Sequence, residues 1–190
     1  VDDYVNHTTI GATLDDAIGE AFDKVARVVG LGYPGGPKID KVAKKGSYNL
    51  QFVKKSDLDK TYNVSYSGLK TAVINYLHKQ EQNGEPVCVE DVACSFEHEA
   101  VDMLAQKAVR AAKEYGLTTI ALAGGVAANS FLRQTMQDLC SKNNLTLTFP
   151  SLVLCTDNAA MIGAAGYFNL ANEQNICYDL SVSPNPSLKL

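Results

Sequence analysis

The stretch Thr118-Thr-Ile-Ala-Leu-Ala-Gly-Gly-Val-Ala-Ala-Asn129 decides the fold. Its residues 118–123 form an apolar run that is typical of a buried strand, and Gly124-Gly125 predicts a tight turn. A helix is predicted over 127–140 and a second strand over 145–149. Because strand, helix and strand follow one another, the sequence indicates an α/β domain with a mostly parallel sheet.

Helices are expected on both sides of this unit. Apolar residues recur at helical spacing over the ranges 14–29, 38–45, 67–82, 89–115 and 158–171. Thr13 is expected to cap the first of these helices, with Asp16 completing a capping box. Residues 4–10 are expected to be extended and residues 46–66 to form a loop with a short strand. Residues 152–154 are expected to lengthen the second strand.

Composition limits the class of protein. The chain has 190 residues, of which 46% are hydrophobic and 20% charged, so it fits one domain or two small ones and no disordered or collagen-like chain. It has no apolar run long enough to cross a bilayer and no secretion signal at its start. Because the first residue is Val1 rather than Met, we expect a fragment or a processed chain.

Charge and cysteine content limit the partners and the compartment. A net charge of −4 and a pI near 5.3 argue against a protein that binds nucleic acid unaided. Only the basic stretches 38–45 and 54–55 could meet RNA phosphate, and both are also ordinary surface. The five cysteines show no CxxC spacing, so a disulfide scaffold or structural zinc site is not expected, and a reducing cytoplasm is. They are Cys88, Cys94, Cys140, Cys155 and Cys177.

Three features could carry chemistry, and each has a structural alternative. Gly124-Gly125 before a helix suits a phosphate, but it is equally typical of any tight turn. The acidic side of the first helix, with Asp16, Glu20 and Asp23, suits ribose hydroxyls. A solvated helix surface explains these acids as well, although the neighbouring glycine- and proline-rich loop 33–37 favours close approach of a ligand.

The third feature is Asp157, between a strand end and a helix start. It could cap that helix or bind a metal, but one carboxylate is not a metal site. His98 lies among Glu97, Glu99 and Asp102. His98 and Asp102 are four positions apart and could form a metal pair, but the pattern favours the charged outer side of a long helix. No HExxH or GxSxG motif is present.

Several segments together resemble one family, the tRNA threonylcarbamoyladenosine transferases (TsaD, also called Gcp, and formerly O-sialoglycoprotein endopeptidase). The resemblance extends in order over residues 10–168. It is carried by TLDDAIGEAFDK (13–24), YPGGP (33–37), SYSGLKT (65–71), AGGVAAN (123–129) and CTDNAAM (155–161).

The resemblance implies an actin/hexokinase/Hsp70-like (ASKHA, ribonuclease H-like) lobe with a mixed sheet flanked by helices. It implies transfer of a threonylcarbamoyl group from its adenylate to the adenosine beside the anticodon in tRNAs that read ANN codons. ATP or ADP is a related ligand. The matching positions for nucleotide contacts are Asp23, Gly36, Asp40, Gly124, Gly125 and Asn129, and Asp157 matches one ligand of an iron or zinc ion.

The family's other metal ligands, two histidines in an HxxxH motif, belong to an amino-terminal half that this chain lacks. Residues 1–12 are therefore expected to be a strand segment of the missing lobe, 13–172 the carboxyl-terminal lobe and 173–190 a tail. We expect this chain alone to bind metal weakly and to transfer nothing. The resemblance also implies tRNA, TsaB- and TsaE-like proteins and a TsaC-like supplier of the adenylate as partners. It implies no membrane, and a cytoplasmic or mitochondrial location.

Two other functions stay open. One is a non-catalytic nucleotide-binding scaffold of the same fold. The other is the metalloprotease of the older family name, against which the absence of HExxH weighs. Asp157 together with Asn129 favours the enzyme, because a scaffold needs neither.

Overall fold

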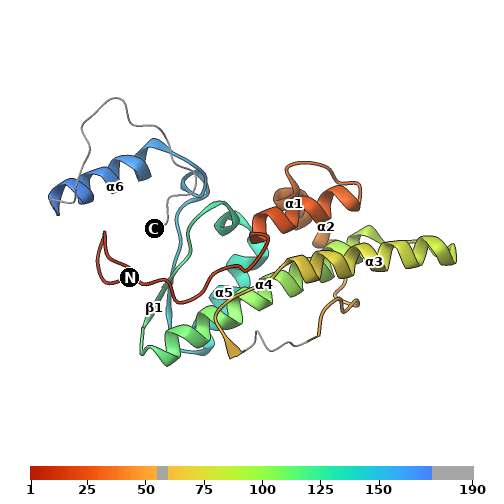
Figure 1. The fold of residues 1–190 in the computed structure, drawn as a ribbon, viewed down its shortest axis with the longest axis horizontal. Helices are drawn as coiled ribbons and strands as arrows, with labels where there is room; N and C mark the ends of the chain where they lie inside the picture. Colours follow the sequence, from red (N-terminus) through yellow and green to blue (C-terminus); the bar gives the residue numbers. More distant parts are fainter. Residues whose placement is uncertain (55–59, 173–190) are drawn as a thin grey trace. The chain divides into compact units, whose positions relative to one another are not determined.

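The computed structural model describes residues 1–54 and 60–172. It divides into two compact units (Figure 1). The larger unit comprises Thr9–Asp157, and the smaller one comprises Val1–Thr8 together with the chain from Asn158. Every residue expected to bind nucleotide or metal belongs to the larger unit, so that unit is the one that can carry the site.

Helices make up most of the larger unit, as the apolar spacing predicts. They are α1 (Ile18–Val28), α2 (Gly35–Ala43), α3 (Ser67–Asn83), α4 (Val89–Glu114) and α5 (Ser130–Lys142). Two short 3-10 helices, η2 (Gly125–Ala128) and η3 (Leu152–Leu154), lie on either side of α5 in the sequence.

The strand–helix–strand unit is confirmed. Strands β1 (Thr119–Ala121) and β2 (Thr146–Thr148) pair in parallel, with Ile120 opposite Leu147. The backbone N–H of Leu122 donates to the carbonyl of Thr148 at 2.9 Å and continues the pairing past β1. Because α5 connects the two strands, this is a crossover connection that places η2 and the start of α5 after the carboxyl end of β1.

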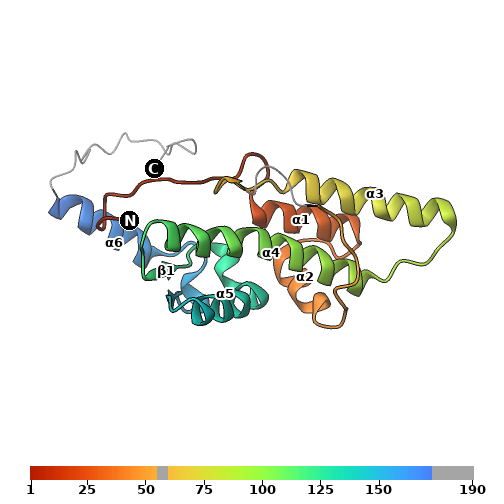
Figure 2. The same cartoon turned by 90° about the horizontal axis from the view of Figure 1, so that it is seen from below.

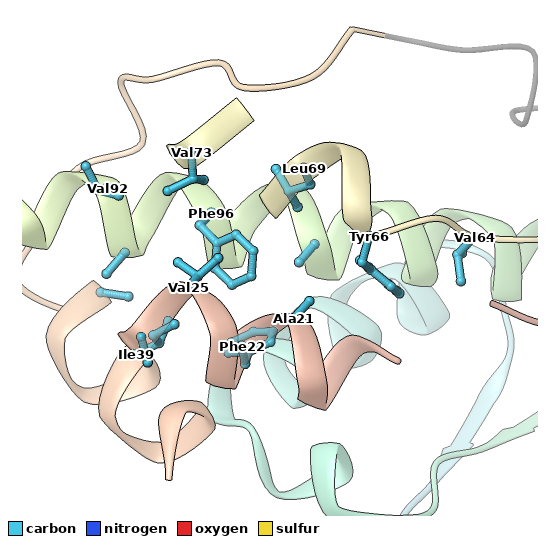
Figure 3. Close-up of a cluster of buried hydrophobic side chains, with 14 residues drawn as sticks. Ala21, Phe22, Val25, Ile39, Val64, Tyr66, Leu69, Val73, Val92 and Phe96 are labelled. Carbon is cyan, nitrogen blue, oxygen red and sulfur yellow. The ribbon is translucent and has the colours of Figure 1, made fainter. Parts of the chain in front are cut away.

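One buried cluster holds the first four helices together. Phe22 and Val25 of α1 point toward Phe96 of α4, and Ile39 of α2 lies beside them (Figure 3). The rings of Phe22 and Phe96 meet edge to face, with 5.1 Å between their centroids. Each of these side chains is no more than 1% exposed, so each contributes about 1.5–3 kcal/mol by burial.

A second cluster begins where the first one ends along α4. Val101 and Ala105 of α4 pack against Leu132, Met136 and Cys140 of α5. Figure 2 shows α5 beside one half of α4 and helices α1 to α3 beside the other half. Helix α4 therefore serves both clusters, and the boundary between them lies near its middle.

The start of α3 is stabilised from a distance. The carboxylate of Asp15 accepts hydrogen bonds from the backbone N–H groups of Tyr66 and Ser67, at 2.8 and 3.1 Å. The hydroxyls of Ser65 and Ser67 donate to its other oxygen. Helix starts carry N–H groups that lack partners within the helix, and Asp15 satisfies the first of these in α3, that of Ser67.

Several sequence-based boundaries were wrong at the first helix. Helix α1 begins at Ile18 after Ala17, not at residue 14, and Thr13 does not cap it. Thr13 instead forms an isolated parallel bridge with Val64, and its hydroxyl donates to the carbonyl of Asp16. Threonine suits an extended position as well as a cap, so the local pattern could not separate the two.

Three further boundaries differ from the prediction. Helix α2 begins at Gly35, so Gly36 lies in its first turn and not in a loop. Helix α5 begins only at Ser130, because the side chain of Asn129 caps it. Residues 152–154 form a 3-10 turn after Pro150 and do not extend β2, because proline lacks the N–H of a strand ladder.

The smaller unit holds α6 (Ala159–Ala171), whose start is capped by the side chain of Asn158. The ring of Tyr4 stacks on that of Phe168 with 3.8 Å between centroids. Residues 1–12 contain no strand. Nowhere in residues 1–54 and 60–172 is a helix both long and apolar enough to cross a bilayer. The expected tail 173–190, Cys177 and Lys55 lie outside the described residues.

Candidate functional site

Two of the expected contact residues, Asn129 and Asp40, meet at the start of α5. Asn129 precedes the helix, and its Oδ1 accepts a hydrogen bond from the backbone N–H of Leu132 at 2.7 Å. Its Nδ2 donates to Oε1 of Glu97, on α4, also at 2.7 Å. Asn129 is therefore both the cap of α5 and a link from α5 to α4.

The next residue makes a matching link to α2. The hydroxyl of Ser130 donates to Oδ1 of Asp40 at 2.5 Å, and the Ser130 backbone N–H lies 3.4 Å from Oδ2 of the same carboxylate. Lys44 lies one helical turn from Asp40, with 3.4 Å between its Nζ and Oδ1. Asp40 and Asn129, 89 positions apart, are thus held at the same end of α5.

A pocket of about 430 Å³ opens between these three helices. Glu97 and Ser130 line it directly, and these are the side chains to which Asn129 and Asp40 are bonded. Its size is within the range of small-molecule sites. The lining residues are Ala43, Lys44, Cys94, Glu97, His98, Ser130, Phe131 and Gln134.

The charge of the pocket wall depends on Glu97. Its side chain is only 3% exposed, and this burial raises the pKa of the carboxyl to about 7. The hydrogen bond from Asn129 and the charge of Lys44 oppose the rise in pKa, whereas the charge of Asp40 adds to it. The pocket therefore has a carboxyl group that changes its charge near neutral pH.

Aromatic rings form another part of the pocket wall. The ring of His98 stacks on Tyr48 with 4.3 Å between centroids, and it lies 4.8 Å from Phe131 at a tilt. The predicted charged outer side of α4 was therefore wrong, since Glu97 and Glu99 are also buried, at 3% and 7% exposed. Helix α4 is covered on more than one side, which its own charge pattern could not reveal.

Asp23 and Gly36 lie at the start of α2. The backbone N–H of Gly35 donates to Oδ1 of Asp23 at 2.6 Å, so Asp23 caps α2 from α1. A Cβ atom on Gly35 would lie 2.6 Å from the Cα of Asp23, whereas one on Gly36 would meet nothing within 4 Å. Gly36 therefore has open space beside it, and Gly35 is fixed by packing.

The three acids that were expected to form one acidic side of α1 contact different partners. Asp16, which lies before α1, bonds Lys24 at 2.7 Å and Lys70 of α3 at 3.0 Å. Glu20 bonds Lys24 as well, at 2.7 Å. Of the three acids, only Asp23 faces α2, so they do not form one common surface for ribose.

The Gly124-Gly125 turn has the backbone that its sequence predicts. Gly124 has a φ of +81°, which favours glycine, and its carbonyl accepts from the N–H of Ala127 at 3.0 Å. A Cβ atom on Gly124 or on Gly125 would meet nothing within 4 Å. The turn after β1 thus leaves open space beside the backbone.

Asp157 is exposed and lies between η3 and α6. It does not cap α6, because Asn158 does so by accepting from the N–H of Met161 at 2.9 Å. Within residues 1–54 and 60–172 no group of three His, Cys, Asp or Glu residues could hold a metal. The described residues alone therefore do not fit the expected iron or zinc ion.

The cysteines of the described residues are unpaired thiols. Cys140 and Cys155 are buried, and Cys88 is exposed. The guanidinium of Arg133 lies 3.2 Å from Sγ of Cys155 and donates to the carbonyl of Pro150 at 2.9 Å. Arg133 thus ties the start of α5 to the segment before Asp157.

Sequence comparison places the chain beside proteins of one name. A model of the family "TsaD: tRNA N6-adenosine threonylcarbamoyltransferase" matches residues 1–164. A protein named tRNA N6-adenosine threonylcarbamoyltransferase from Clostridioides difficile (strain 630) is 46% identical over 191 residues, which are 100% of this chain and 56% of that protein. A protein of the same name from Staphylococcus aureus (strain Newman) is 47% identical over 189 residues, covering 99% of this chain and 54% of that protein.

The chain thus spans about half the length of the curated relatives that it matches. Among solved structures, the crystal structure of T. kodakarensis HypF is similar, with a TM-score of 0.62. The sequence identity is 22%, and the match covers 82% of this chain and 20% of that one. At this identity the likeness shows a shared fold only.

Proposed function

The chain belongs to the tRNA N6-adenosine threonylcarbamoyltransferase family, and from that membership we propose that it carries the nucleotide-binding part of such an enzyme. The reaction proposed for the whole protein is transfer of a threonylcarbamoyl group from its adenylate to the adenosine beside the anticodon in tRNAs that read ANN codons. The fold proposed for this part is an actin/hexokinase/Hsp70-like lobe, which the parallel β1–α5–β2 unit supports.

One observation carries the placement of the adenylate. Asp40 and Asn129, two expected contact residues far apart in sequence, hold the Ser130 and Glu97 side chains that line one pocket. The pocket volume of about 430 Å³ suits a nucleoside, and Phe131 and His98 give its wall aromatic surface. We place the adenosine part of the adenylate in this pocket.

The open backbone beside Gly124 and Gly125 supports a place for the phosphate. Backbone N–H groups of a glycine turn before a helix attract anions, and a ligand can approach them closely. In this arrangement Asp40 would accept from ribose hydroxyls, and Asn129 would donate to the ligand through its amide. Gly36 would allow the ligand to pass close to α2.

Asp157 is proposed as one ligand of an iron or zinc ion in the longer protein, with the other ligands supplied from outside this chain. The partners proposed for the whole protein are tRNA, TsaB- and TsaE-like proteins, and a TsaC-like enzyme that makes the adenylate. We propose a cytoplasmic location, with a mitochondrial form as the alternative.

Calorimetric titration of this chain with ADP tests the proposed site. We expect binding that Asp40→Ala and Asn129→Ala each weaken by about tenfold or more, because each removes a hydrogen bond to the ligand. Asp102→Asn, an exposed acid on α4, is the matched control and should bind like the wild type. Equal affinity for ADP in all variants would contradict a nucleotide site at the start of α5.

The reaction itself is tested on a full-length version with tRNA and a source of the adenylate, and mass spectrometry of the digested tRNA is the measurement. We expect modification by the full-length protein and none by this chain alone. ADP binding only by the full-length protein would show that the site requires both parts. Modification by this chain alone would contradict our assignment of it to half an enzyme.

A further inference from the structure

Glu97 is a buried carboxyl group to which the proposed function assigns no contact with the nucleotide. It lies in the first half of α4, is 3% exposed and lines the pocket. Burial of a carboxyl group costs free energy unless the group has hydrogen-bond partners. Its partner is Nδ2 of Asn129, 2.7 Å from Oε1.

The orientation of the Asn129 amide follows from its two contacts. The backbone N–H of Leu132 can only donate, so the atom that faces it must be Oδ1. Nδ2 therefore faces Glu97, and one of its two protons is used there. Among the described residues, no contact uses the second Nδ2 proton.

We propose that Glu97 is a positioning residue of the nucleotide site, which fixes the Asn129 amide so that its second N–H group stays available to the adenylate. The inference rests on the proposed function. The hydrogen bond with Leu132 holds one end of the amide only. Glu97 holds the other end, so the amide is oriented before the ligand arrives and loses less freedom on binding.

The neighbouring buried acid shows what a purely structural role looks like. Glu99 is 7% exposed, and its carboxylate accepts from the backbone N–H groups of Phe52 and Val53, at 3.0 and 3.1 Å. Glu99 holds the loop before α3 and does not line the pocket. Glu97 and Glu99 are thus a matched pair, two positions apart on one helix.

Two substitutions of similar size separate the roles. Glu97→Gln keeps an oxygen that can accept from Asn129, whereas Glu97→Met fills the same space without an acceptor. In the 190-residue chain, we expect E97Q to bind ADP within about twofold of the wild type, and E97M to bind about fivefold or more weakly. Glu99→Gln, the control, should leave the dissociation constant for ADP unchanged.

An NMR measurement tests the hydrogen bond without any ligand. The two Nδ2 protons of Asn129 should give separate, slowly exchanging signals in the wild type and in E97Q. In E97M these signals should shift and exchange faster. If Glu97 had a purely structural role, the Asn129 signals and the ADP affinity would not both be lost in E97M and both be kept in E97Q.

The outcomes are distinguishable. Unchanged Asn129 signals, or unchanged ADP affinity, in E97M would overturn the positioning role. If the wild-type chain shows the amide signals but binds no ADP, the same variants are compared in the full-length protein. There, no ADP binding by the wild type would overturn the proposed nucleotide site, and wild-type affinity in E97M would overturn the positioning role alone. If E97M does not fold, Glu97→Asp replaces it. Its shorter side chain withdraws the carboxylate from Asn129, so the same loss of affinity is expected, and wild-type affinity would overturn the proposal.

Discussion

The hydroxyl of Ser130 lies 2.5 Å from Oδ1 of Asp40, across 90 positions of sequence. This hydrogen bond joins the start of α5 to α2 at the wall of the pocket. A hydrogen bond to a charged group contributes about 1.5–3 kcal/mol to stability, which is more than a neutral pair contributes. The contact therefore links the stability of the fold to the shape of the candidate site.

Ser130→Ala should lower the free energy of unfolding by about 1–2 kcal/mol, because Asp40 keeps Lys44 but loses the hydroxyl. A thermal melt should show a fall in Tm of about 2–8 °C for a chain of this size. Ser141→Ala, at an exposed position near the end of the same helix, is the control and should melt like the wild type. Equal melting of both variants would contradict the importance of the Asp40 contact.

Gly35 and Gly36 should respond oppositely to alanine. Gly35→Ala should cost about 1–3 kcal/mol, because the new Cβ would lie 2.6 Å from the backbone of α1. Gly36→Ala should leave stability unchanged or raise it by up to about 1 kcal/mol, because its surroundings are open and alanine favours helix. Urea denaturation measures both.

Gly36→Ala also tests whether the ligand lies close to α2. If the adenylate passes close to α2, Gly36→Ala should weaken binding of ADP while the chain stays folded. Normal ADP binding by G36A would remove Gly36 from the proposed contacts. The stability of G36A makes this result independent of folding.

Stability should depend on pH through Glu97. Its pKa is about 7 in the folded chain, against 4.5 when unperturbed, so the folded state binds more protons between these values. Wild-type stability from this group therefore falls as pH rises from about 4.5 to 7, and the loss is complete above 7. The other titratable groups facing it are Asp40, Lys44, Cys94 and His98.

Glu97→Gln removes this titration. Relative to the wild type, E97Q should gain stability as pH rises from 5 to 8, by up to about 3 kcal/mol. Denaturant curves at several pH values measure the difference. Asp102→Asn removes an exposed charge from the same helix and should show a difference of less than about 0.5 kcal/mol throughout. A flat difference for E97Q would contradict the raised pKa.

Asp15→Ala should destabilise the start of α3. Partial burial raises the pKa of Asp15, but hydrogen bonds from Ser65, Tyr66 and Ser67 outweigh it and hold the pKa well below its usual range. The loss expected at pH 7 is about 1–2 kcal/mol, as for other helix caps. Because a lowered pKa favours the charged form, this contribution should begin to decrease as pH falls below about 4 and should be lost only at the lower folded-state pKa. An unchanged unfolding midpoint at pH 7 would show that the cap contributes nothing.

Much of the fold could be predicted from local sequence. The apolar run before Gly124 and the helix pattern after it predicted the parallel strand pair, because both signals lie within a few residues of one another. Ends of helices were less predictable. Thr13 could either cap a helix or lie in an extended segment. The bridge to Val64, 51 positions later, favours the extended conformation.

The contacts of the candidate site could not be predicted in the same way. Asp40 and Asn129 were singled out through the family resemblance, and no local pattern indicated that Ser130 and Glu97 hold them. Glu97 looked exposed, because a charged residue on a helix usually is. Its burial depends on α2 and α5 covering α4, which is a property of the whole packed unit.

Helix α4 also determines the order in which the unit can form while the chain is being synthesised. The first buried cluster uses residues between Ala21 and Ala100, so all of its parts have been synthesised before α5 is made. The second cluster needs Leu132, Met136 and Cys140. Until α5 has been synthesised, the part of α4 that α5 covers has no partner. The pocket beside Glu97 is complete only once α5 packs there. A nascent chain halted before Asn129 contains every residue of the first cluster and lacks the part of the pocket wall that α5 supplies.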